Sequence, residues 1–214
     1  MYILTIEDLL DHLDEDLAWR KKELTEIKFL IYGAPYGNLQ INLRMGVVMI
    51  YAHWEGFIKN AGDYYINYLS QKNLRYEDIT DNFIALSLKT KIKECGATNK
   101  TSVHSEIVNI LVNELNSQAN IPYTYEVKRR GILTYELFSE LLFTLGLDRS
   151  FFELKQTLIN HVLIGTRNKI AHGNRDRVEE KDFIELYEKI IPMLEHFKFQ
   201  IFDAAENELY KRTT

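Results

Sequence analysis

A short segment in the last third of the chain combines an arginine, an asparagine and a histidine that suit chemistry on a phosphodiester. Arg167, Asn168 and His172 lie close together, and Gly173 follows them. A guanidinium stays charged and can hold a phosphate through two parallel hydrogen bonds. An imidazole can exchange a proton near neutral pH. Together these groups could help the 2′-hydroxyl of RNA attack the adjacent phosphate without a metal ion, while Asn168 orients the phosphate or His172.

The spacing of the arginine and the histidine does not by itself place them on one face. We predict a helix from about Phe151 to His172, and at about 100° per residue the two side chains point about 140° apart. The long arm of Arg167 and a frayed helix end at His172 would bring them together within one chain. Alternatively, a twofold axis would place the arginine of one chain beside the histidine of its copy. A surface arginine with a helix-capping histidine is the non-catalytic alternative.

The same projection gives this predicted helix two faces. The inward face is expected to hold Ile159, Val162, Leu163, Thr166 and Ile170. The opposite face is smaller and more polar, and it holds His161, Gly165, Asn168 and His172. His161 could therefore reach the site formed by Asn168 and His172, and the alternative is a structural role.

Glu55 is a further candidate, in a different part of the sequence. It ends the run Tyr51-Ala52-His53-Trp54-Glu55 on a predicted apolar helix, where an unpaired buried carboxylate is costly. One interpretation is that Glu55 approaches Arg167 or His172 and orients it. The other is a solvent-facing glutamate beside a core tryptophan.

Cationic residues near the motif are candidates for contact with RNA phosphates. Lys169, Arg175 and Arg177 could form a local positive rim, although neighbouring acidic residues dilute it. Lys128, Arg129 and Arg130 form a more concentrated basic run in a predicted loop. A solvated charged surface is the alternative interpretation of both groups.

The composition excludes several classes of protein. The net charge of −5 argues against a broad nucleic-acid-coating surface, so RNA contact must come from a local patch. The single cysteine excludes a disulfide within the chain and a cysteine-based zinc site. No phosphate-binding glycine loop, histidine pair at zinc spacing or nucleophile elbow is present. We therefore expect neither a metal nor a cofactor.

The sequence also favours a cytoplasmic protein. Its start has no basic region followed by an apolar run, as a secretory signal would have. The longest apolar stretch, residues 45–54, is far short of the roughly 20 residues that a membrane span needs. A single cysteine fits a reducing compartment.

Apolar residues recur at helical spacing along most of the chain, which predicts an all-α fold. A capping-box pattern at residues 5–8 starts the first helix. We predict one domain over residues 1–214 and treat residues 76–132 as a helical and loop insertion. The expected helices cover about 6–32, 39–71, 81–95, 102–116, 134–145, 151–172 and 179–210, and the first two form a hairpin.

The segment from Leu163 to Gly173 resembles the HEPN superfamily. The family motif is an arginine, a polar residue that is often asparagine, a short gap and a histidine, and Arg167, Asn168 and His172 fill these places. Residues 5–10, residues 51–57 and the final helix are similar to a prokaryotic, defence-associated branch.

This resemblance implies an antiparallel helical bundle that forms a homodimer, with two copies of the motif lining one cleft. Many members are toxins or antiviral effectors that cut RNA without a metal and leave a 2′,3′-cyclic phosphate. Arg167 would then bind the phosphate, His172 would transfer protons, and Asn168 and Glu55 would orient them. An antitoxin or defence-system protein is an expected partner. The alternative is a non-catalytic HEPN module that binds RNA or a regulatory partner.

Overall fold

The structure is a computed structural model that describes residues 2–35, 37–123 and 131–212. These residues form eight α-helices and no β-strand, so the predicted all-α class is confirmed. A π-helix, η3 (Leu158–Ile164), and a short 3-10 helix, η1 (Tyr76–Asp78), accompany them. The α-helices are α1 (Ile6–Tyr32), α2 (Leu39–Ser70), α3 (Asp81–Gly96), α4 (Thr101–Asn113), α5 (Tyr135–Thr144), α6 (Ser150–Glu153), α7 (Gly165–Ala171) and α8 (Glu180–Glu206).

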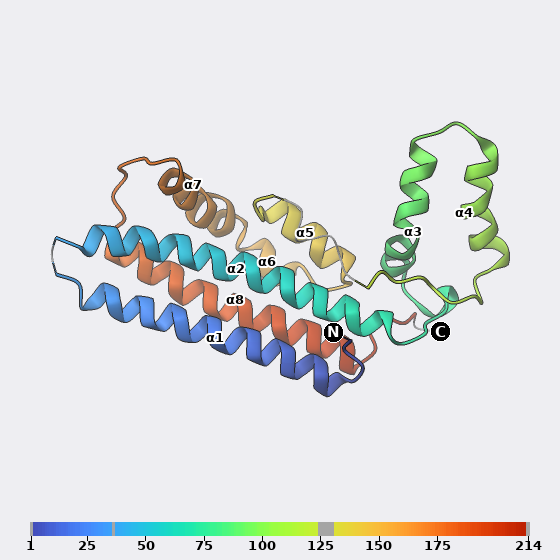
Figure 1. The fold of residues 1–214 in the computed structure, drawn as a ribbon, viewed down its shortest axis with the longest axis horizontal. Coiled ribbons are helices and arrows are strands. Elements are labelled where there is room, and N and C mark those ends of the chain that lie inside the picture. The colour runs from blue at the N-terminus through green and yellow to red at the C-terminus, as the bar shows by residue number, and fades with distance from the viewer. Residues whose placement is uncertain (1, 36, 124–130, 213–214) are drawn as a thin grey trace.

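Three long helices form the body of the molecule. Helices α1, α2 and α8 run side by side along its length, and α5 and α7 lie against α2 (Figure 1). Their apolar faces meet in a core where Trp54, Phe57 and Phe197 are fully buried. None of the described helices is long and apolar enough to cross a bilayer. Helix α2 thus contacts both other long helices and also supports the segment that carries the motif.

The two ends of α1 can be explained by residues close to them in the sequence. The capping box at α1 is confirmed, because the Thr5 hydroxyl accepts from the Asp8 amide and the Asp8 carboxylate accepts from the Thr5 amide. At the other end of α1, Leu30 is exposed, whereas Ile31 is buried. Position 31 lies seven residues after Leu24, which is close to two full turns.

Helix α8 is shorter than predicted. It ends at Glu206 rather than near Tyr210, because the chain leaves the helix at Glu208 with a φ of 51°. Phe183, Ile190 and Leu194 recur at helical spacing, which predicts one inward face, and all three are buried.

A buried ion pair within α1 contacts α2. The Asp16 carboxylate accepts from Arg20 Nε at 3.1 Å and from Asn60 Nδ2 at 3.2 Å. Both members of the pair are about 5–6% exposed. A Cβ on Gly56 would lie 2.6 Å from Arg20 NH1, so the small residue makes room for the guanidinium. The two charged groups are therefore buried at the interface between α1 and α2 and are hydrogen-bonded there, rather than exposed to solvent.

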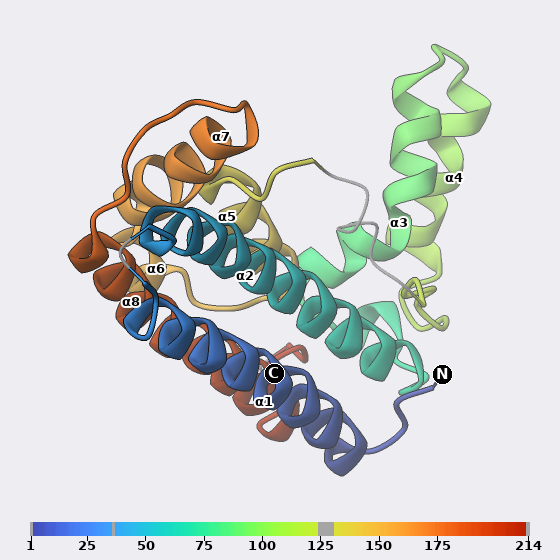
Figure 2. The ribbon, with the colours of Figure 1, turned by 60° about the vertical axis from the view of Figure 1, so that its left-hand side comes forward.

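The predicted insertion contains a helical hairpin. Helices α3 and α4 pack against each other and project away from the long helices (Figures 1 and 2). No residue of α4 is fully buried, and Val108, Leu111 and Val112 form an exposed apolar stripe. The basic run Lys128-Arg129-Arg130 lies outside the described residues.

We expect Asp16→Ala to lower the free energy of unfolding by about 3–5 kcal/mol, because Arg20 would keep a buried charge without its carboxylate partner. Asp11→Ala is the matched control on an exposed position of the same helix, with an expected change within about 0.5 kcal/mol. Urea unfolding of both variants measures the difference. Equal effects would show that the buried pair does not stabilise the α1–α2 interface.

Candidate functional site

The motif lies on a helix that is less regular than predicted. After α6 the chain turns at Leu154 and Lys155, then becomes helical again, and η3 (Leu158–Ile164) runs directly into α7. The predicted single helix over 151–172 is therefore wrong. A π-helix closes its hydrogen bonds one residue farther along the chain than an α-helix does, so its turns are wider.

This π-helix changes which side chains face the core. Val162 was predicted to point inward but is 40% exposed, whereas Ile164 is buried. Ile159 and Leu163 are buried as predicted. A projection at a constant angle per residue fails here, because it assumes α-helical turns through residues 158–164.

The end of α7 presents His172 to solvent. The Gly173 amide donates to the Ile170 carbonyl at 3.0 Å, and the Asn174 amide donates to the Lys169 carbonyl at 3.0 Å. This is a Schellman ending, and Gly173 supplies the left-handed backbone with a φ of 79°. His172 is the exposed C-cap residue, at the position where the sequence predicted the helix to end.

Arg167 points from α7 onto α2. Its guanidinium carbon lies 5.0 Å from the centre of the Tyr51 ring, which is a cation–π contact. Its NH1 group donates to the Asn168 side-chain oxygen at 3.0 Å. Arg167 is half-buried, so the ring and the amide restrain the guanidinium while part of it remains accessible.

Tyr51 is itself held by polar groups from two directions. Its hydroxyl accepts from the Leu133 amide at 3.0 Å and is hydrogen-bonded to the Glu55 side chain. Lys59 Nζ donates to Glu55 at 2.8 Å and to the Gly131 carbonyl at 3.4 Å. Burial, aided by the Glu55 charge, raises the pKa of Tyr51 to about 12. The phenol therefore remains protonated at neutral pH.

Comparison with protein families gave a match over nearly the whole chain. A family model described as HEPN_MAE_28990-like HEPN matches residues 9–210. The chain belongs to the HEPN superfamily. No curated protein and no solved structure matched it. HEPN membership indicates an RNase-like or RNA-binding function.

The HEPN motif is not closed within a single chain. Among the described residues no hydrogen bond or ion pair joins the side chains of Arg167 and His172; Arg167 lies within α7 and His172 is its C-cap residue. Glu55 contacts Tyr51 and Lys59, and no hydrogen bond from it to the arginine or the histidine is present in the described part of the chain. Its orienting role remains a prediction.

The predicted cationic rim is exposed and partly neutralised. Lys169 Nζ lies 3.3 Å from the Asp176 carboxylate, while Arg175 and Arg177 are exposed on the loop after the motif. Arg44 on α2 also reaches this loop and donates to the Asp176 carbonyl. The contact of these cations with RNA remains a prediction.

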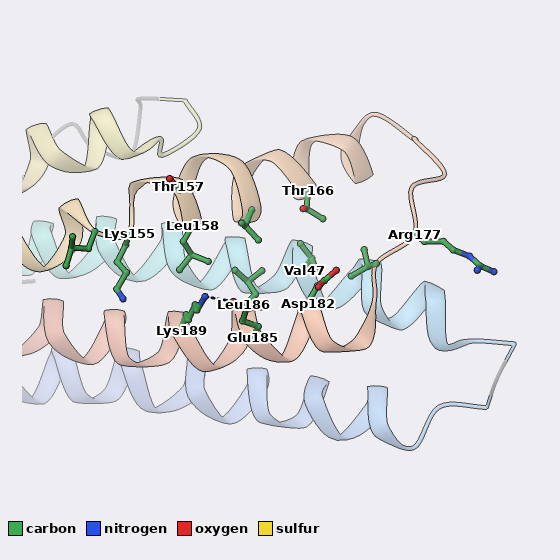
Figure 3. Close-up of a pocket in the computed structure, with 13 residues that line it drawn as sticks. Val47, Lys155, Thr157, Leu158, Thr166, Arg177, Asp182, Glu185, Leu186 and Lys189 are labelled. Carbon is green, nitrogen blue, oxygen red and sulfur yellow. Dashed lines mark hydrogen bonds and ion pairs between the residues drawn. The ribbon is translucent and has the colours of Figure 1, made fainter.

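A groove of about 560 Å³ lies beside the HEPN motif but is not built from it. Leu158 and Val162 of η3 form one wall and Leu186 of α8 the other, with Lys155 and Lys189 near one end (Figure 3). Thr166 lines this groove, whereas Arg167, Asn168 and His172 do not. The candidate catalytic side chains thus lie outside this groove.

Tyr51 was not identified as a site residue from the sequence. Its hydroxyl and ring contacts come from segments 82 and 116 positions away, Leu133 and Arg167. The only sequence signal was its position in the 51–57 segment that resembles the family.

We expect Gly173→Ala to lower the free energy of unfolding by about 1 kcal/mol, because an L side chain is strained at positive φ. Nothing lies within 4 Å of a Cβ at Gly173, so the effect would come from the backbone alone. Gly96→Ala at the end of α3 is the matched control, since its surroundings are equally open and its φ is ordinary. The control should be neutral or stabilising by up to about 1 kcal/mol. Thermal unfolding compares the two, and a neutral Gly173→Ala would contradict the strained ending.

Proposed function

We propose that this HEPN chain is a metal-independent endoribonuclease that acts as a homodimer in the cytoplasm, as a toxin or antiviral defence effector. The observation that carries the proposal is the restrained guanidinium of Arg167 on the same short helix as the exposed imidazole of His172. Membership in the HEPN superfamily supports the same chemistry.

In the proposed reaction, Arg167 of one chain binds the scissile phosphate and His172 of the partner subunit transfers the proton. The imidazole takes the proton of the 2′-hydroxyl while that oxygen bonds to phosphorus. The bond from phosphorus to the 5′-oxygen breaks, and the imidazolium returns the proton to the departing oxygen. The products are a 2′,3′-cyclic phosphate and a 5′-hydroxyl. Asn168 orients the guanidinium.

A surface next to the motif supports the dimer. Ile41, Met45, Val48 and Ala52 share one face of α2 by their spacing of three and four residues. Ile41 and Met45 are about 60% exposed, and Ala52 is exposed as well. This stripe adjoins Tyr51, on which Arg167 lies. An exposed apolar stripe of this kind is typical of a protein interface.

A partner-binding role has its own support in the exposed apolar stripe of α4, formed by Val108, Leu111 and Val112. If the chain binds RNA without turnover, it is the non-catalytic HEPN module. An antitoxin or defence-system protein is the partner class that fits either role.

We expect His172→Ala and Arg167→Ala each to reduce cleavage of total cellular RNA by at least about 100-fold, because each removes one element of the proton-transfer and phosphate-binding pair. Both variants should unfold with wild-type stability, since neither side chain is fully buried. His104→Ala, on the projecting hairpin, is the control and should cleave normally. Cleavage that survives both site variants, with chelator present, would reject the assignment.

We expect Met45→Asp to convert the dimer to a monomer and to abolish cleavage, because it places a charge in the apolar stripe of α2. Phe199→Asp, at a similarly exposed position on α8, is the control. Sedimentation velocity measures the oligomeric state. A dimer that withstands Met45→Asp but is broken by Phe199→Asp would place the interface on α8 and contradict the proposal.

A further inference from the structure

We propose that Tyr51 is the positioning residue for Arg167, and that Glu55 acts on the arginine only through Tyr51. This inference rests on the proposed function in assigning Arg167 to phosphate binding. It deepens that function by identifying what sets the direction of the guanidinium.

The ring of Tyr51 provides a fixed surface under the guanidinium. Tyr51 is only 2% exposed, and its ring centre lies 5.0 Å from the guanidinium carbon. Asn168 occupies one amino group of Arg167 at 3.0 Å. The Tyr51 ring thus covers one face of the guanidinium, and Asn168 accepts a hydrogen bond from its NH1 group. The remaining N–H groups can bind a phosphate through paired hydrogen bonds.

The hydroxyl of Tyr51 fixes the position of the ring. It accepts from the backbone amide of Leu133 and is bonded to Glu55 on the next turn of α2. Lys59 holds Glu55 at 2.8 Å and also donates to the carbonyl of Gly131. The Tyr51 ring is therefore restrained on two sides: by Glu55 on its own helix, and by the segment of Gly131 and Leu133 that follows the insertion.

This arrangement gives Glu55 a role in orienting Arg167 although the two side chains are not in direct contact. Its carboxylate accepts from the ammonium of Lys59 and binds the phenol of Tyr51. A chain of contacts then runs from Lys59 through Glu55 and Tyr51 to Arg167. Because the pKa of Tyr51 is raised to about 12, the phenol does not act as a base at neutral pH, and its contribution is orientation.

The test compares variants that remove different parts of this chain. Tyr51→Leu removes the ring, Tyr51→Phe removes only the hydroxyl, and Glu55→Ala removes the carboxylate. Tyr68→Leu is the matched control, because Tyr68 is also buried on α2 and also carries a cation on its ring, Lys72 at 4.3 Å. The control measures the cost of losing a buried tyrosine far from the motif.

The first readout is the ¹⁵N-correlated side-chain Nε–H resonance of Arg167, assigned by its absence in Arg167→Lys. We expect the aromatic ring to shift this resonance in the wild type. Tyr51→Leu should move it to the position of an exposed arginine, while Tyr51→Phe and Tyr68→Leu leave it shifted. An unchanged resonance in folded Tyr51→Leu would overturn the proposal.

The second readout is RNA cleavage. We expect Tyr51→Leu to lower kcat/KM at least tenfold, with no comparable loss in Tyr68→Leu. Tyr51→Phe and Glu55→Ala should each cause a severalfold loss, and the double variant should lose no more than either alone, because both act through the same hydroxyl. Additive losses would overturn the route from Glu55 through Tyr51, and this comparison remains decisive if Tyr51→Leu does not fold.

The two readouts separate the inference from the proposed function. A wild type that cleaves no RNA but shows the ring-shifted Arg167 resonance, lost in Tyr51→Leu, rejects the ribonuclease and retains the positioning by Tyr51. A wild type that cleaves RNA but shows no effect of Tyr51→Leu on the resonance or on kcat/KM retains the ribonuclease and rejects the positioning.

Discussion

The structure depends on the packing of the other elements around α2. Helices α1 and α8 bury its apolar sides, and η3 and α7 rest on a third side. Gly46 shows how close this packing is, since a Cβ there would lie 2.6 Å from the Phe183 ring. On α2, only the apolar stripe that includes Ile41 and Met45 remains exposed to solvent. The contact of α7 with α2 brings Arg167 onto Tyr51, so the packing of the bundle also determines the geometry of the motif.

The same constraint leaves the proposed site incomplete within a single chain. The guanidinium of Arg167 is restrained by groups within the chain. His172 is exposed at the end of α7, and among the described residues no hydrogen bond or ion pair involves its imidazole. The groove beside η3 is lined by neither residue. A second copy docked on the open stripe of α2 would supply the missing half of the site and would cover exposed apolar surface at the same time.

Much of the fold could be predicted because its signals are local. The capping box at Thr5, the inward stripe of α8 and the glycine ending at Gly173 each depend on residues within a few positions of one another. The π-helix could not be predicted from periodicity, because the usual projection assumes α-helical turns. The family motif identified Arg167, Asn168 and His172 as candidates. The contact of Arg167 with Tyr51 joins elements far apart in sequence, so no local pattern encodes it.

The central claim is that each site takes its arginine from one chain and its histidine from the other. The most direct measurement mixes Arg167→Ala protein with His172→Ala protein, allows the subunits to exchange, and assays RNA cleavage. In a heterodimer, one of the two sites would then combine an intact arginine with an intact histidine, by the twofold symmetry of the dimer. The account predicts that the mixture recovers about a quarter of wild-type activity, since about half of the dimers would be mixed and each would have one working site. A mixture that exchanges subunits yet stays as inactive as its two parents would contradict the shared site.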